Sequence, residues 1–163
     1  MAKKRAQVKD LAREIGKSGG FELPEQEAYL NLLRTCQSLA GEFERLFEQY
    51  GLSDAQYNAL RILRGHGKAM QVYQVAGQMV TRQPDITRLF DRLEKAKLIK
   101  RRRCEEDRRV VWVELTQAAR EVLKKLDEPV LRLHRKQLGH LGPRKLRQLS
   151  QLLTEARQCE PGI

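Results

Sequence analysis

A basic segment between residues 95 and 109 carries the most distinctive chemistry in the sequence. It holds eight lysines or arginines and three acidic residues, a net charge of +5. Guanidinium groups bind phosphate oxygens and the edges of guanine bases, and neighbouring cations repel one another unless an anionic partner is present. The whole chain is also basic, with a formal net charge of +11. These charges favour an anionic partner: nucleic acid, an acidic membrane face or an acidic protein.

The residues that catalysis or metal binding would require are not grouped. The sequence has no nucleophile elbow, no Walker sequence and no dinucleotide-binding glycine loop. Its histidines and cysteines are scattered without metal-ligand spacing, at His66, His134, His140, Cys36, Cys104 and Cys159. We therefore expect no enzyme, with no catalytic residue, no metal and no cofactor. The odd cysteine count suits a reducing compartment, and no apolar run has the length of a membrane span. We expect a cytoplasmic, nucleoid-associated protein.

Two short helices precede and enter the basic segment. Small and apolar residues recur at helical spacing from residue 72 to 78, and a polar break covers residues 81–83. Pro84 suits the first position of a second helix, because its missing N–H would have no partner there. This second helix, predicted at about residues 83–96, has one apolar side formed by Ile86, Leu89, Phe90 and Leu93. Two helices joined by a tight turn predict a helix-turn-helix with the second as the recognition helix.

The β-branched and apolar runs at residues 98–101 and 110–113 predict the two strands of a hairpin. The charged residues 102–109 between them form its tip, so the wing covers about residues 98–115. A helix-turn-helix followed by a basic hairpin is a winged helix.

The ordered set Ile86-Thr87-Arg88-Leu89-Phe90-Asp91-Arg92-Leu93-Glu94, then Asp107-Arg108-Arg109, then Leu115-Thr116 resembles the MarR family of winged-helix transcriptional regulators. The resemblance covers roughly residues 30–156. It implies a mainly α (α+β) fold whose long terminal helices interlock in an obligate homodimer. The sequence departs from the family at Val80 and Lys97, where glycine is usual, and this places the geometry of both turns in question.

The predicted organisation has four parts. A basic arm at residues 1–23 precedes a dimerisation helix at 24–51. The winged helix-turn-helix covers residues 52–116, and C-terminal dimerisation helices cover 117–158. Ser53 with Gln56 predicts a capping box, Thr116 predicts a second helix cap, and Pro129 should kink or interrupt the helix that follows.

We expect double-stranded DNA to be contacted by the turn, the start of the recognition helix and the wing. Arg88 is expected to contact a base or phosphate in the major groove, the alternative being an intrahelical ion pair with Asp85 or Asp91. The resemblance implies that Arg109 enters the minor groove. The expected contact residues are Arg82, Gln83, Pro84, Thr87, Arg88, Arg101, Arg102, Arg103, Asp107, Arg108 and Arg109.

The resemblance also implies a small aromatic or phenolic effector, bound in a crevice between the dimerisation helices and the winged helix. By position this crevice would be lined by Leu39, Phe43, Tyr57, Leu60 and Arg61, the alternative being that they are ordinary core residues. Cys36 is expected in the core. Cys104 lies among arginines that favour its thiolate, which makes it a candidate redox sensor beside DNA.

These features together predict a sequence-specific DNA-binding transcriptional regulator, an effector-responsive repressor acting as a homodimer on a pseudo-palindromic operator. The alternatives are a nonspecific architectural DNA-binding protein and a winged-helix module that binds protein.

Overall fold

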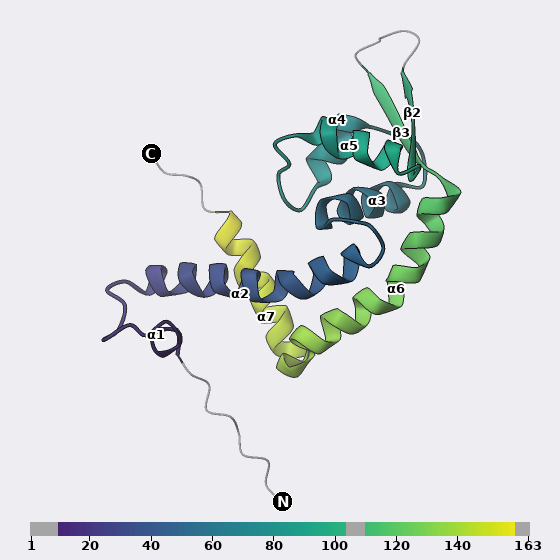
Figure 1. Ribbon diagram of the computed structural model, residues 1–163. Coiled ribbons are helices and arrows are strands. Elements are labelled where there is room, and N and C mark those ends of the chain that lie inside the picture. Colours follow the sequence, from purple (N-terminus) through teal and green to yellow (C-terminus); the bar gives the residue numbers. More distant parts are fainter. Residues whose placement is uncertain (1–9, 104–109, 159–163) are drawn as a thin grey trace, which may run out of the picture. The chain divides into compact units, whose positions relative to one another are not determined.

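The computed structural model describes residues 10–103 and 110–158 (Figure 1). The chain forms two compact units, divided between residues 41 and 42. The first unit contains α1 (Leu11–Glu14) and the first part of α2 (Pro24–Glu48), and α2 continues into the second unit.

The second unit is a winged helix followed by two long helices. Its further elements, in order, are α3 (Asp54–His66), β1 (Met70–Gln71), α4 (Val72–Gln78), α5 (Ile86–Lys95), β2 (Ile99–Arg103), β3 (Val111–Leu115), α6 (Gln117–Leu138), the 3-10 turn η1 (Gly139–Leu141) and α7 (Gly142–Arg157). The three strands form an antiparallel sheet in the order β1-β3-β2, with Arg101 opposite Val113. This arrangement confirms the predicted mainly helical winged-helix fold. The short strand β1 was not predicted.

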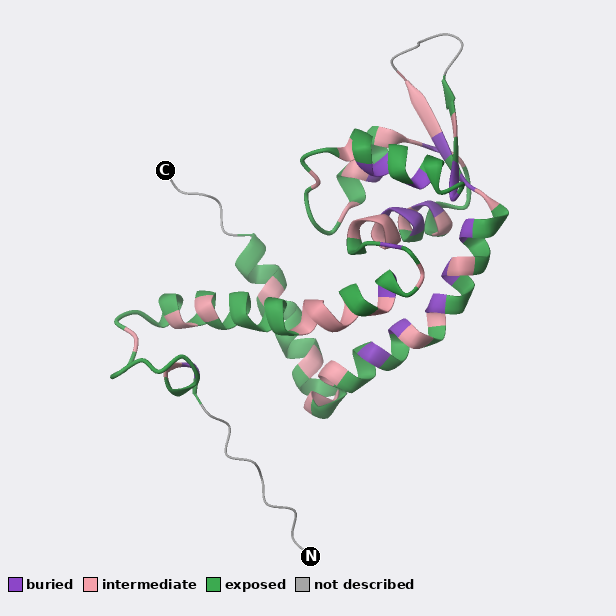
Figure 2. Cartoon of the chain, viewed as in Figure 1, coloured by how far each residue is buried: buried purple, intermediate pink, exposed green. Residues whose placement is uncertain are grey.

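The hydrophobic core of this unit lies between α3, α5, the sheet and α6. Its fully buried side chains include Leu60, Phe90, Leu93 and Val113. On α6 the buried residues alternate at spacings of four and three, as expected for a helix that packs along one side: Ala119, Leu123, Leu126, Val130 and Leu133 (Figure 2). Helix α5 is therefore packed on the core by its apolar side, formed by Leu89, Phe90 and Leu93, and its other side is exposed.

The predicted helix caps are confirmed. Ser53 Oγ accepts the Gln56 N–H at 3.3 Å, and the Gln56 side chain accepts the Ser53 N–H at 2.8 Å. Thr116 Oγ1 accepts the Ala119 N–H at 3.2 Å and so caps α6. Gly67, with φ 76°, ends α3 in the left-handed conformation.

The two predictions about proline differ in outcome. Helix α5 begins at Ile86, and Pro84 lies in the turn before it, so its predicted place as the first helical residue is wrong; Asp85 is the capping residue and accepts the Arg88 N–H at 3.0 Å. Of the kink or interruption predicted at Pro129, the interruption is absent, because α6 continues from residue 117 to 138. Its buried side packs on the core on both sides of the proline, which offsets the lost hydrogen bond.

Lys97 and Val80, which stand where the family usually has glycine, differ in backbone conformation. Lys97 keeps the glycine-like backbone, with φ 58°. Its N–H donates to Glu94 O at 2.8 Å and the Leu98 N–H donates to Leu93 O at 3.0 Å, the two bonds of a Schellman motif. Val80 does not have positive φ; its N–H donates to Asn58 Oδ1 of α3 at 3.0 Å.

Several apolar side chains on the terminal helices face solvent. No residue of α7 is buried in this chain, although leucines follow its length (Figure 2). The exposed apolar residues include Tyr29, Leu32 and Leu33 of α2, Leu131 of α6, and Leu149 and Leu152 of α7. Cys36 of α2 is exposed too, so its predicted place in the core is wrong for this chain alone. None of the described helices combines the length and apolar character needed to cross a bilayer.

Candidate nucleic-acid interface

The turn between α4 and α5 is supported from α3, by the bond from the Val80 N–H to Asn58. The exposed residues of this turn and of the first turn of α5 lie within one short segment, residues 82–88. Arg82, Pro84 and Thr87 are exposed, and Gln83 is half-buried with its Nε2 3.3 Å from Thr81 Oγ1. The structure therefore brings these predicted DNA-binding residues together on one exposed segment.

Arg88 makes the intrahelical pair that the sequence offered as an alternative. Its Nε lies 2.9 Å from Asp85 Oδ2, and its side chain is 78% exposed. Such an exposed pair contributes only a few tenths of a kcal/mol, about what is measured for pairs on helix surfaces. Arg88 can therefore exchange this carboxylate for DNA at little cost.

Arg101 has a different environment from Arg102 and Arg103, the other described arginines predicted in the wing. Its side chain is only 20% exposed, and its Nη1 lies 2.8 Å from Asp91 Oδ1 of α5. Arg102 and Arg103 are exposed. The alternation of side chains along a strand could have indicated this difference, because Arg101 falls on the same side of β2 as the buried Ile99.

Four predicted site residues lie outside the described residues: Cys104, Asp107, Arg108 and Arg109. Their expected roles in minor-groove binding and redox sensing stay predictions.

Several of the proposed effector-lining residues contact other aromatic side chains. The Phe43 ring centroid lies 4.8 Å from that of His134, and the Tyr57 ring stacks on Phe47 at 4.1 Å. Phe43 and Tyr57 are half-buried, and so is Leu39 in the first unit. Leu60 is fully buried within the core, which agrees with the alternative interpretation of that residue as structural.

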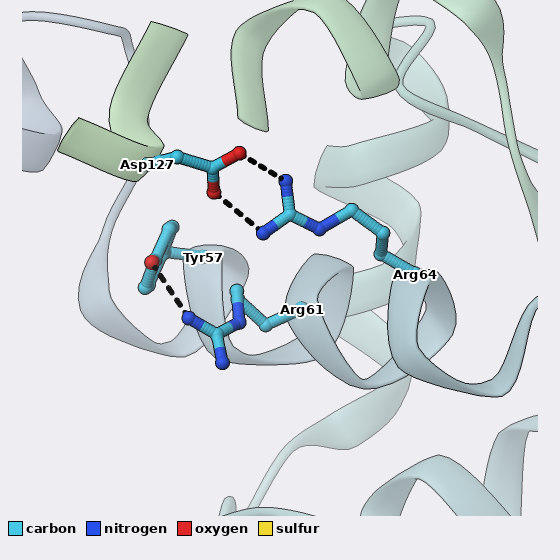
Figure 3. Close-up of polar contacts among 4 residues, drawn as sticks. All are labelled: Tyr57, Arg61, Arg64 and Asp127. Atoms are coloured by element: carbon cyan, nitrogen blue, oxygen red, sulfur yellow. Dashed lines mark hydrogen bonds and ion pairs between the residues drawn. The ribbon is translucent and has the colours of Figure 1, made fainter. Parts of the chain in front are cut away.

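Three polar side chains of α3 lie near α6, and one of them, Arg64, pairs with Asp127 of that helix (Figure 3). Arg64 donates from both Nη atoms to Asp127, at 3.0 and 2.6 Å, which is the bidentate geometry of a guanidinium with a carboxylate. Arg61 donates to the Tyr57 hydroxyl at 3.3 Å. The sequence analysis did not find the Arg64–Asp127 pair, because the two residues are 63 positions apart. The pair ties the winged helix to α6.

The first turn of α3 carries the perturbed carboxyl of Asp54. Partial removal from water raises the pKa of Asp54, and the nearby negative charge of Glu44 raises it further. Asp54 is therefore protonated more readily than an ordinary aspartate.

Residues 52–111 match the MarR family. The solved structure of a MarR transcription factor from Planctomyces limnophilus is 45% identical; it covers 83% of this chain and 98% of that one, with a TM-score of 0.65. BpsR of Bordetella bronchiseptica, solved in a study of its regulation by 6-hydroxynicotinic acid, is 25% identical over 87% of this chain and 100% of that one, with a TM-score of 0.74. The transcriptional repressor MdtR of Bacillus subtilis is 33% identical over 53% of this chain and 56% of its own length.

Proposed function

This chain belongs to the MarR family of DNA-binding transcriptional regulators, and from this premise we propose that it is an effector-responsive repressor that binds a pseudo-palindromic operator as a homodimer. The family consists of regulators and not of enzymes, so the expectation that this chain is not an enzyme is confirmed. The observation that carries the proposal is the exposed segment from Arg82 to Arg88, set on a rigid apolar core beside a basic hairpin.

Base reading is assigned to the start of α5. An arginine that pairs with guanine contributes ~1–3 kcal/mol of discrimination against other bases. Arg88 takes this role, with Gln83, Pro84 and Thr87 at the height of the base edges. Arg82 contacts phosphate, and so do Arg102 and Arg103 of the wing and Arg108 beyond the described part of the hairpin. Arg109, also beyond the described part, enters the minor groove. Such a regulator acts in the cytoplasm, on nucleoid DNA.

A homodimer is supported by the apolar side of α7. Full burial of one leucine side chain is worth ~1.5–3 kcal/mol, and Leu149 and Leu152 are exposed in the single chain. A second copy provides the most economical cover, because a twofold pair buries the same side chains twice. Sedimentation equilibrium should give twice the chain mass of 18.9 kDa, and Leu149→Glu with Leu152→Glu should give a monomer.

Repression is supported by the likeness to MdtR, and a small aromatic acid as effector is supported by the likeness to BpsR. The half-buried rings of Phe43 and Tyr57 offer aromatic stacking to such a ligand, and the exposed Arg61 offers a cation. Calorimetric titration with hydroxylated aromatic acids tests this part separately from DNA binding.

The central experiment measures binding to the DNA upstream of the protein's own gene, with random DNA as competitor, at two salt concentrations. Arg88→Ala should weaken specific binding by ~1–3 kcal/mol and relax the base preference. Arg132→Ala on α6 is the matched control, since it removes the same charge from an exposed position. It should change the Kd less than twofold.

Equal affinity for operator and random DNA would contradict the proposal and favour an architectural DNA-binding protein. Absence of binding to any DNA would favour a module that binds an acidic protein instead.

A further inference from the structure

One stripe of the recognition helix meets a single side chain of the wing. Thr87, Phe90, Asp91 and Glu94 lie at spacings of three, one and three along α5, which places them on one side of the helix. Arg101 of β2 reaches all four.

The guanidinium of Arg101 lies close to polar oxygens of α5 at each of its nitrogens, although the buried Nε pairs with Glu94 by charge alone and makes no hydrogen bond. Its Nη1 lies 2.8 Å from Asp91 Oδ1 and its Nε 3.4 Å from Glu94 Oε2. Its Nη2 donates to the Thr87 carbonyl at 3.4 Å, and its Cζ lies 6.0 Å from the centre of the Phe90 ring. The planar fork of arginine thus spans two turns of α5, which a single ammonium group does not do.

Packing between α5 and the hairpin is incomplete around this residue. A cavity of about 400 Å³ lies between α4, α5 and the two long strands, and Arg101 lines it together with Tyr73, Ile86, Thr87, Phe90 and Val111. Beside this cavity the polar contacts of Arg101 add to the apolar packing of Phe90 and Leu93 against the sheet.

The local charges also oppose a direct role in phosphate binding. Arg101 sits between two carboxylates, and its side chain is 20% exposed whereas that of Arg88 is 78% exposed. To reach phosphate it would have to leave Asp91 and Glu94 unpaired beside DNA. Kept in place, it neutralises carboxylates that would otherwise repel the phosphate backbone.

We propose that Arg101 is a positioning residue for DNA recognition: it fixes the recognition helix against the wing and shields Asp91 and Glu94, and it does not itself contact phosphate. This inference rests on the proposed function, which supplies the DNA.

The first test compares Arg101→Lys and Arg101→Met with Arg102→Met, an exposed neighbour on the same strand. Lysine keeps the charge that a phosphate contact needs but lacks the fork. Both Arg101 variants should therefore raise the operator Kd on the order of tenfold, with Arg101→Lys keeping the wild-type dependence of log K on log salt. Arg102→Met should instead lower that slope by ~0.9, the amount for one phosphate contact. Wild-type affinity in Arg101→Lys, with a slope lowered by ~0.9 in Arg101→Met, would overturn the proposal.

The second test removes the acidic partners. Asp91→Asn with Glu94→Gln adds two units of positive charge, which should tighten binding if Arg101 only attracts phosphate. Under the proposal the double variant binds more weakly, and adding Arg101→Met to it changes the Kd less than twofold. Tighter binding, or an undiminished effect of Arg101→Met, contradicts the proposal.

A third measurement needs no DNA. Amide hydrogen exchange of α5 should be about tenfold faster in Arg101→Lys and in Arg101→Met than in the wild type, and unchanged in Arg102→Met. Wild-type exchange in both Arg101 variants would show that the residue does not hold the helix. Because this readout is independent of the operator, a failure of the proposed function and a failure of the positioning role are distinguishable.

Discussion

Replacing Lys97 with glycine should stabilise the protein. Lys97 holds φ 58° at the end of the recognition helix, and a left-handed backbone costs an L residue ~1–2 kcal/mol. Glycine avoids this cost but loses ~0.5–1 kcal/mol more conformational freedom on folding. The backbone bonds from Lys97 and Leu98 to Glu94 and Leu93 do not involve the lysine side chain. The net gain is therefore ~0.5–1 kcal/mol, about 1–4 °C in Tm for a chain of this size.

Urea unfolding, followed by helical circular dichroism at one fixed protein concentration, measures this gain. Lys95→Gly is the matched control, because the same substitution two positions earlier falls inside the right-handed helix. At that position glycine should lower the free energy of unfolding by up to ~1 kcal/mol. The two variants should therefore shift stability in opposite directions. A loss of stability in both would refute the conclusion that Lys97 is strained.

Three further predictions concern the supports of the winged helix. Asp127→Asn should lower the free energy of unfolding by ~0.5–1 kcal/mol, since the ion pair of Asp127 with Arg64 is half-exposed. A double-mutant cycle between these two residues should show a coupling energy that declines with salt, and strict additivity of the two substitutions would contradict this prediction. Glu44→Gln should return the pKa of Asp54 only part of the way to its ordinary value, as seen by NMR titration, because burial is the larger cause. With the folded pKa raised, the stability that Asp54 contributes is present at low pH and is lost as the pH rises through that folded pKa. Asn58→Ala should lower the free energy of unfolding by ~0.5–1.5 kcal/mol and speed the hydrogen exchange of the Val80 amide, which Asn58 binds. Unchanged exchange of that amide would show that the bond is dispensable.

The features that were predicted correctly depend on residues close in sequence. The Ser53–Gln56 capping box and the Thr116 cap each involve a side chain and a peptide group three residues away. The strands of the wing follow from short β-branched runs. In such cases the local chain contains both partners of the interaction.

The errors arise where two local preferences compete or where the partner is distant. Pro84 and Asp85 both suit the start of a helix, and the aspartate prevails because it supplies an acceptor for the Arg88 N–H. The ion pairs of Arg101 with Asp91 and Glu94 were not predicted, because these partners lie on another element. Cys36 follows an apolar pattern that the single chain leaves uncovered.

Helix α6 also has a mechanical consequence. Its 22 residues extend about 33 Å at the usual rise of 1.5 Å per residue. Its buried stripe and the Arg64–Asp127 pair fasten the winged helix to this rod, so the two should move as one body. A tilt of roughly 5° about the far end would swing the near end by ~3 Å, a displacement that follows from the helix length alone. The rod thus acts as a lever arm, and a ligand that altered its angle slightly at the C-terminal end would displace the recognition helix by more than a bond length.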